Sequence, residues 1–439
     1  MSLDIDYILP SWESESIIQN LEISNLQDVG TEKWFQYHKN ILQLNQQSVL
    51  EIRNMREETI KEWFVNYQKI PVLIYEAIQI AIWKQKVFPL IIELNGEPAN
   101  TFMIYSIFYH ENIAVSLMEN ILFHRDSLES LDDSALDLID YAVNNITTSI
   151  IFVEETVNAE PLDTSCIGEL LYKRKEIEFN IGMMSVAIIG YLASSAEQMP
   201  LSVLKRLLMT HDIPYIFTQL IEKRPWKKKN PEGEDMVYTS SWEKQKSNEE
   251  DKICKLEGQV WIGLRELLLN PKCAPYYQIT AFRLSELTKL QKQLHERILD
   301  QISPLIDLRR WLSYLNVSSL PEETKPIICV EIIPQIRSSI INKYKKQWKK
   351  LARYQSESLY RKDIEYLQTI AQILSVAYDF DKINKETKVC ARCNDAACKR
   401  CSKCKSVWYC GRECQVKDWS SHKSTCDKIM NKNFDDVQE

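Results

Sequence analysis

Glycine and proline are scarce in this sequence. Its 439 residues include 9 glycines and 15 prolines, together about half of ordinary usage. Because these residues form most tight turns and interrupt helices, their scarcity argues against a chain built from many hairpins and favours long helices. A chain of this length can bury a large core and form two to four domains or one extended array.

Sequence patterns for catalysis are also missing. No glycine-rich phosphate loop and no Gly-x-Ser-x-Gly nucleophile turn occurs. The histidines outside the last fifty residues stand alone, without a His-x3-His or Glu-x2-His metal pattern. They are His38, His110, His124, His211 and His295. We therefore expect a protein that is not an enzyme.

The sequence shows no sign of a secretory signal, a membrane span or an excess of basic charge. The first residues are acidic and lack the apolar core of a signal peptide. The longest uncharged run, Asn180 to Ala196, is shorter than the roughly 20 apolar residues that a span needs, so a buried helix is predicted there. A net charge of −7 gives no overall attraction to nucleic acid. We expect a soluble, intracellular protein with no membrane span and no nucleic-acid partner.

Helical periodicity runs through most of the chain. Apolar residues recur at three- and four-residue steps in Trp34–Leu50, Ile113–Phe123, Leu136–Ile151, Leu256–Leu269 and Ile364–Leu374. Two further runs open with an apolar residue and proline, at Ile70-Pro71 and Ile213-Pro214, which resembles the third helix of armadillo-type repeats. We predict an all-α fold with an armadillo-like helical-repeat body, stacked as a solenoid rather than closed as a bundle.

Two segments break this pattern and suggest the domain boundaries. Residues 223–252 lack apolar periodicity and are rich in charge, so a flexible, solvated loop is predicted. The three lysines 227–229 within it are interpreted as solvated, with a nuclear address as the alternative. Residues 379–389 predict a polar linker. The body then comprises residues 1–222 and 253–378, a compact module spans 390–426, and 427–439 form a polar tail.

A basic segment lies near the end of the predicted body. From Arg337 to Arg353 the sequence carries seven basic residues and no acidic one. A separate face of the predicted amphipathic helix is apolar and comprises Ile341, Tyr344, Trp348 and Leu351. Such a helix can bind an anionic membrane, calmodulin or phosphate groups. We favour the simpler interpretation, in which the apolar stripe packs on the body and the lysines face water.

Metal-ligand residues cluster near the end of the sequence. They are Cys390, Cys393, Cys401, Cys404, Cys410, Cys414, His422 and Cys426. Eight such ligands satisfy two tetrahedral zinc ions, and both ions are structural because protein fills every position. Disulfides are the alternative, but clustered, paired cysteines without a signal peptide favour metal. The spacing leaves open whether the two sites are sequential or interleaved. The isolated cysteines, expected to be buried and reduced, are Cys166, Cys254, Cys273 and Cys329.

The run from Tyr409 to Trp419, with the ligands that follow it, closely resembles a MYND zinc finger. That family interleaves its ligands. The resemblance implies one zinc held by Cys390, Cys393, Cys410 and Cys414, and another held by Cys401, Cys404, His422 and Cys426. Cys398 is then a spare thiol, although Cys398 and Cys401 also have the spacing of a ligand pair.

The same resemblance implies a peptide-binding role for the finger. MYND fingers bind short peptides containing proline and leucine in a shallow groove, and the matching positions here are Ser402, Gln415 and Trp419. A tryptophan provides an apolar anchor and a glutamine amide can bond to a peptide backbone. The alternative is that Trp419 only covers the small zinc core.

Three segments outside the finger extend the likeness over most of the chain. Residues Ile82–Pro89, Thr210–Pro214 and Leu256–Ile262 are similar to a family of factors for preassembly of axonemal dynein arms. This resemblance implies a cytoplasmic adaptor, with centriolar satellites or the apical region near cilia as further locations. It implies as partners a leucine-rich-repeat assembly factor, chaperones or co-chaperones, and axonemal dynein chains as clients. The alternatives are a nuclear MYND-type corepressor adaptor and a SET-type methyltransferase. The sequence lacks a DNA-associated domain for the former and the Asn-His motif of the latter.

Overall fold

The computed structural model describes residues 8–98, 100–151, 165–245, 252–317, 332–385, 390–393, 397, 399–401 and 407–435. The chain divides into two compact units, Met1–Leu367 and Gln368–Glu439. The first unit contains the helical body and the second contains the cysteine-rich module. The boundary falls inside one helix, α18 (Ile364–Lys385).

The described part of the chain is predominantly helical, so the predicted all-α class is confirmed. In the body the α-helices are α1 (Ser11–Gln19), α2 (Glu32–Arg53), α3 (Thr59–Asn66), α4 (Ile70–Lys86), α5 (Phe88–Asn95), α6 (Phe102–Leu122), α7 (Arg125–Glu129), α8 (Ser134–Ile146), α9 (Cys166–Ser194), α10 (Leu201–Lys205), α11 (Ile213–Lys223), α12 (Lys255–Leu269), α13 (Ala281–Lys289), α14 (Glu296–Gln301), α15 (Leu305–Val317), α16 (Ile336–Tyr344) and α17 (Trp348–Leu359). Short 3-10 or π turns are η1 (Leu26–Asp28), η2 (Thr147–Ile151), η4 (Arg206–Thr210), η6 (Ala274–Tyr276) and η7 (Leu290–Lys292).

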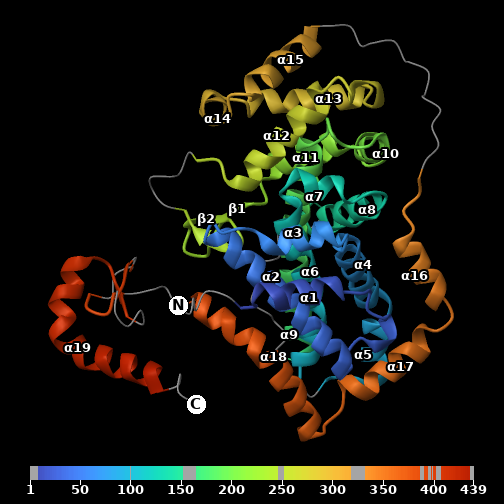
Figure 1. Ribbon diagram of the computed structural model, residues 1–439. Coiled ribbons are helices and arrows are strands. Elements are labelled where there is room, and N and C mark those ends of the chain that lie inside the picture. Colours follow the sequence, from blue (N-terminus) through green and yellow to red (C-terminus); the bar gives the residue numbers. More distant parts are fainter. Residues whose placement is uncertain are drawn as a thin grey trace. The chain divides into compact units, whose positions relative to one another are not determined.

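A column of long helices forms the centre of the body. The most extensive contacts join α4 to α6, α6 to α9, α8 to α9 and α9 to α12, and Figure 1 shows the helices stacked broadly in chain order. Phe108, Ile189 and Trp261 on these helices are fully buried. Each helix therefore buries its apolar side against its neighbours in the stack, as the predicted helical-repeat architecture requires.

The uncharged run around residues 180–196 lies in the core. It forms the second half of α9, which is long and apolar enough to cross a membrane, yet 72% of its most apolar window is buried inside the body. Val186, Ile188 and Leu192 are inaccessible to solvent. The prediction of a buried helix is confirmed for this segment.

Two glycines allow α9 and α12 to cross closely. A Cβ atom on Gly190 would lie 2.5 Å from Cγ of Gln259, and one on Gly263 would lie 2.9 Å from Phe217 and 3.0 Å from Ala193. All three distances are shorter than ordinary van der Waals contact. The few glycines of the chain thus include two that permit a tight helix crossing.

Both apolar-proline pairs begin helices, as predicted. Pro71 and Pro214 occupy the first turns of α4 and α11, where a missing N–H costs no helical hydrogen bond. Asp212 precedes α11 and its carboxylate accepts the backbone N–H of Tyr215. The same carboxylate accepts bonds from Tyr277 and Arg283, each at 2.8 Å, so it links this helix start to the segment after α12.

Residues 227–244, within the charged segment predicted to be a flexible loop, form a small sheet. Three short antiparallel strands, β1 (Lys227–Lys229), β2 (Asp235–Tyr238) and β3 (Trp242–Lys244), form a sheet in the order β1-β2-β3. Tyr238 and Trp242 pack against Phe179 of α9, with ring centroids 5.7 Å apart in each case. These widely spaced aromatic residues escaped the periodicity analysis. They anchor the sheet on α9, so the prediction of a solvated loop is wrong for residues 227–244.

One of the three lysines predicted to be solvated contacts an aromatic ring instead. Lys228 Nζ lies 4.3 Å from the ring centroid of Trp242, a cation–π contact. Its neighbour Lys229 pairs with Asp235 at 3.3 Å on the exposed surface. These two charged side chains therefore lie on a small folded sheet.

The segment 335–360, which we call the return segment, packs on helices near the start of the chain. It contains α16 and α17, which contact α4 and α5 respectively, as Figure 1 shows in orange against blue. Trp83 Nε1 donates to Gln355 Oε1 at 2.8 Å, and Gln355 Nε2 donates to the Leu26 carbonyl at 2.6 Å. Both side chains are buried. This long-range docking joins residues more than 250 positions apart and had no counterpart in the sequence analysis.

The basic segment forms two helices rather than the single helix predicted. α16 ends at Tyr344 and α17 begins at Trp348. Of the predicted apolar stripe, Tyr344 and Leu351 are buried, whereas Ile341 and Trp348 are half-buried. The lysines of the segment are exposed, as the favoured interpretation predicted.

The predicted linker 379–389 is helical as far as Lys385, because α18 spans Ile364–Lys385. Its remaining residues lie outside the described part of the chain. Of the isolated cysteines that were expected to be buried, Cys273 is buried, and Cys166 and Cys254 are half-buried. Cys329 lies outside the described residues.

Candidate metal centre

The first predicted ligand group is assembled in the second unit. The sulfur atoms of Cys390, Cys393, Cys410 and Cys414 all lie within 4.8 Å of one another. Cys393 Sγ lies 3.5 Å from Cys410 Sγ and 3.9 Å from Cys414 Sγ. Tetrahedral ligands at 2.3 Å from a zinc ion are separated by about 3.8 Å. The four thiols therefore fit one zinc ion.

The second group brings Cys401, His422 and Cys426 within the same 4.8 Å limit. All three are buried, and the sulfur atoms of Cys401 and Cys426 are 3.9 Å apart. The fourth predicted ligand, Cys404, lies outside the described residues, as does Cys398. The two groups alternate along the chain, so the interleaved order implied by the resemblance is the one the described ligands adopt. Two structural zinc ions are consistent with this donor set.

Backbone groups prepare one thiol for metal binding. Partial desolvation of Cys390 opposes ionisation, but hydrogen bonds from the backbone of Cys393, Cys410 and Arg392 lower the pKa of its thiol to about 6. The thiolate is the form that binds a metal ion. At neutral pH the unbound site therefore already favours one anionic ligand.

A two-stranded ladder and one helix hold the ligands in place. β4 (Lys399–Arg400) pairs antiparallel with β5 (Trp408–Tyr409), and α19 (Arg412–Asp435) follows. Tyr409 is fully buried against the ligand cysteines, and its hydroxyl donates to Asp418 of α19 at 2.7 Å. This hydrogen bond fixes the strand to the helix that supplies Cys414, His422 and Cys426.

The two ligand pairs with four-residue spacing differ in local structure. His422 and Cys426 share one face of α19. Cys410 precedes that helix, which begins at Arg412, and the bend at Gly411 brings its sulfur to 3.5 Å from that of Cys414.

The predicted peptide groove is only partly described. Gln415 and Trp419 are one turn apart on α19, whereas Ser402 lies outside the described residues. Trp419 is 36% exposed and its ring centroid lies 6.0 Å from that of His422. Its ring thus covers a zinc ligand and also faces solvent. Val416, 65% exposed beside them, is an apolar surface residue that the sequence analysis did not single out.

Three of the isolated histidines of the body, His38, His110 and His211, contact polar side chains. His38 and His110 are fully buried with their Nδ1 atoms 2.9 Å apart, and burial lowers the pKa of His38 well below its ordinary value. His211 Nε2 lies 2.6 Å from the Asp140 carboxylate. Within the described part of the chain, no other cluster of three metal-type side chains accompanies the two described above.

Comparison with known proteins agrees with the geometry. The family model described as "MYND finger" matches residues 390–426. The fold and the metal centre thus define a helical protein of adaptor type with a MYND zinc finger. The zinc finger MYND domain-containing protein 10 homolog of Drosophila melanogaster is 33% identical over 453 aligned positions, covering 96% of this chain and 99% of that protein. The chain belongs to the zinc finger MYND domain-containing protein 10 family.

Other relatives are similar over short stretches. Ubiquitin carboxyl-terminal hydrolase 15 of Arabidopsis thaliana is 52% identical over 44 residues, 10% of this chain and 5% of that protein. Tudor domain-containing protein 1 of Mus musculus is 49% identical over 41 residues, 9% of this chain and 4% of that protein. These matches are too short to describe the helical body. No solved structure matches the chain significantly.

Proposed function

We propose that this protein is a non-enzymatic cytoplasmic adaptor for the preassembly of axonemal dynein arms. The body and the finger engage different partners. These partners are a leucine-rich-repeat assembly factor, chaperones or co-chaperones, and axonemal dynein chains as clients. The proposal is carried by the family relationship, which extends over 96% of this chain and 99% of its Drosophila relative and so includes the body as well as the finger.

The metal centre supports an adaptor role for the finger. Four described thiols can hold one zinc ion and three described ligands the other. With Cys404 as the predicted fourth ligand of the second site, we assign both ions a structural rather than a catalytic task. Zinc binding would stabilise the finger and so hold α19 in place, with Gln415, Val416 and Trp419 at its surface. An anchoring tryptophan beside an amide suits a short peptide that carries one apolar side chain.

Affinity purification from cells that build motile cilia tests the proposal. The bait is the full chain, and a truncation to residues 1–388 removes the finger. Enrichment of dynein heavy chains and chaperones with the full chain, and loss of a subset with the truncation, is the expected result. Recovery of chromatin proteins instead would favour the nuclear corepressor alternative and overturn the proposal.

A point substitution tests the groove within the finger. Trp419→Ala removes the apolar anchor, and because Trp419 is not a metal ligand, zinc content should stay unchanged while capture of the finger's partner falls about tenfold, as for a binding hot spot. Lys423→Ala, an exposed change on the same helix, is the matched control. Equal capture of the partner by wild type and Trp419→Ala would show that Trp419 covers the zinc core and does not bind the peptide.

A further inference from the structure

The return segment presents an unpaired basic surface. Lys345, Lys346, Lys349, Lys350 and Arg353 are all exposed, and none of them has a carboxylate partner among the described residues. Glu357 lies one turn beyond Arg353 without forming an ion pair with it. Elsewhere on the body, lysines such as Lys61 and Lys84 pair closely with carboxylates. A concentration of free cations is therefore a local property of this segment in a chain whose net charge is −7.

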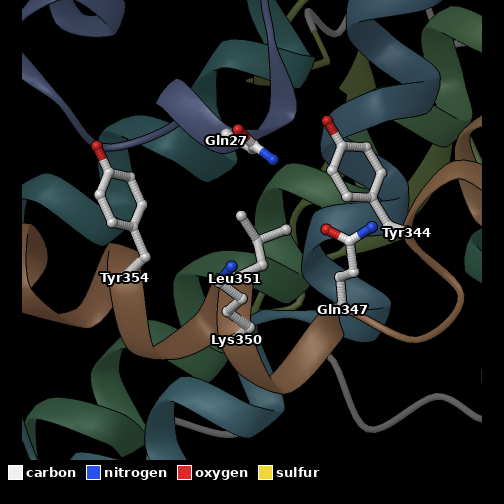
Figure 2. Close-up of a pocket in the computed structure, with 6 residues that line it drawn as sticks. All are labelled: Gln27, Tyr344, Gln347, Lys350, Leu351 and Tyr354. Atoms are coloured by element: carbon white, nitrogen blue, oxygen red, sulfur yellow. The ribbon is translucent and has the colours of Figure 1, made fainter.

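A small pocket opens beside these cations. It has a volume of about 180 Å³ and is lined by Gln27, Tyr344, Gln347, Lys350, Leu351 and Tyr354. Figure 2 shows the two tyrosines at its ends, with Leu351 and Lys350 between them and Gln27 on the facing segment. Tyr354 is 55% exposed, whereas Leu351 and Tyr344 are buried. The pocket thus combines an apolar floor, two amide groups and a cationic rim.

The size of the pocket decides what it can hold. Pockets for cofactors and drug-sized ligands span about 300–1,000 Å³, so this one is too small for them. It fits one apolar or aromatic side chain. A carboxylate beside such a side chain would meet Lys350 in the lining of the pocket, and further carboxylates could reach the other exposed cations of the segment.

We propose that the pocket, with the exposed cations between α16 and α17 (Lys345 and Lys346) and on α17 (Lys349, Lys350 and Arg353), forms a docking surface for an acidic peptide with one apolar or aromatic residue among its carboxylates. The surface is separate from the peptide groove assigned to the finger. It does not depend on the proposed role in dynein-arm assembly. The complementary charge would speed encounter and set the orientation, while the inserted side chain would supply the contact that holds the peptide.

The packing of the return segment disfavours a lipid surface as the partner. An interfacial helix binds membranes by burying its apolar face among the acyl chains. Here Ile340, Tyr344 and Leu351 are already buried in the body, so these apolar side chains are not available to enter a membrane. A long nucleic acid would also meet the acidic remainder of the chain, whereas a short acidic peptide need only contact the patch.

A binding titration with the zinc-loaded full chain tests this surface. The probe is a short fluorescein-labelled peptide of glutamates with one central leucine, and one reference peptide carries glutamine in place of every glutamate. Binding in the micromolar range that weakens with added salt is expected for the acidic peptide only. A second reference peptide, with glycine in place of the central leucine, should bind more weakly because it leaves the pocket empty.

Charge reversal locates the binding surface. Lys350→Glu combined with Arg353→Glu should weaken peptide binding about tenfold, since two favourable charge contacts become repulsive. Lys292→Glu combined with Arg309→Glu makes the same change in net charge at two exposed positions elsewhere and should leave binding within about twofold. Circular dichroism melting of both variants verifies that each remains folded.

Three outcomes would overturn the proposal. The first is equal peptide binding by the two charge-reversed variants, which would reduce the effect to net charge. The second is equal binding of the glutamine peptide. The third is tighter binding of phosphatidylserine vesicles or of a single-stranded oligonucleotide than of the acidic peptide, which would assign the patch to a different class of partner.

Discussion

The body and the finger are stabilised by different interactions. The body buries large apolar side chains along a column of helices, with Trp34, Phe108 and Trp261 inaccessible to solvent. Among the described residues of the finger, the buried cluster consists of Tyr409 and three ligand cysteines. Domains shorter than about 40 residues rarely bury enough surface to fold without metal ions or disulfides. Zinc therefore replaces the hydrophobic core in the finger and has no such role in the body.

The largest expected effect is the loss of zinc. Each structural ion contributes on the order of 10 kcal/mol to folding, so a strong chelator should unfold the finger. A zinc-binding dye should report two ions released per chain, and limited proteolysis should cleave within residues 390–426 while leaving a stable body fragment. Release without any gain in protease sensitivity would mean that the finger folds without metal.

Removing one ligand should affect one site. Cys404→Ala should lower zinc content toward one ion per chain, because the group of Cys401, His422 and Cys426 would lose its fourth donor. Cys398→Ala is the matched control and should retain both ions. Atomic absorption on the purified proteins gives the count, and the reverse outcome for the two variants would exchange the assignments of Cys398 and Cys404.

A cavity in the body should leave the finger intact. Phe108 is fully buried and packs edge-to-face on Phe88, so Phe108→Ala should lower the stability of the body by about 3–5 kcal/mol. Urea unfolding followed by helical circular dichroism measures the loss. Zinc content should not change, and a loss of zinc in this variant would show that the two units depend on each other.

Two glycines of α12 sharpen the account of the body. Gly263→Ala would force a Cβ against Phe217 and Ala193 and should destabilise by about 1–3 kcal/mol. Gly258→Ala places its Cβ at ordinary contact distance from Ile302 (3.7 Å) and Ile253 (4.0 Å) and should stabilise by up to about 1 kcal/mol, because alanine favours the helix. Thermal melts of the two variants should shift in opposite directions. Equal shifts would contradict the close crossing of α9 and α12.

Features that depend on local spacing were predictable from the sequence. The proline at the start of α4, the buried α9 and the two ligand groups each follow from residues that are close in sequence or repeat at fixed steps. The interleaved ligand order did not follow from spacing and came from the MYND resemblance.

Features that depend on distant contacts were not predictable. The sheet of residues 227–244 rests on Phe179, and the return segment depends on the buried bond between Trp83 and Gln355. Neither contact leaves a periodic pattern in the sequence.

Hydrogen exchange measured by mass spectrometry, with and without chelator, tests the central claim most directly. If zinc stabilises the finger alone, chelation accelerates amide exchange throughout residues 390–426 and leaves the exchange rates of the slow amides in α6 and α9 unchanged. Loss of protection in α6 and α9 on chelation would contradict it, as would a finger whose exchange does not respond to the removal of zinc.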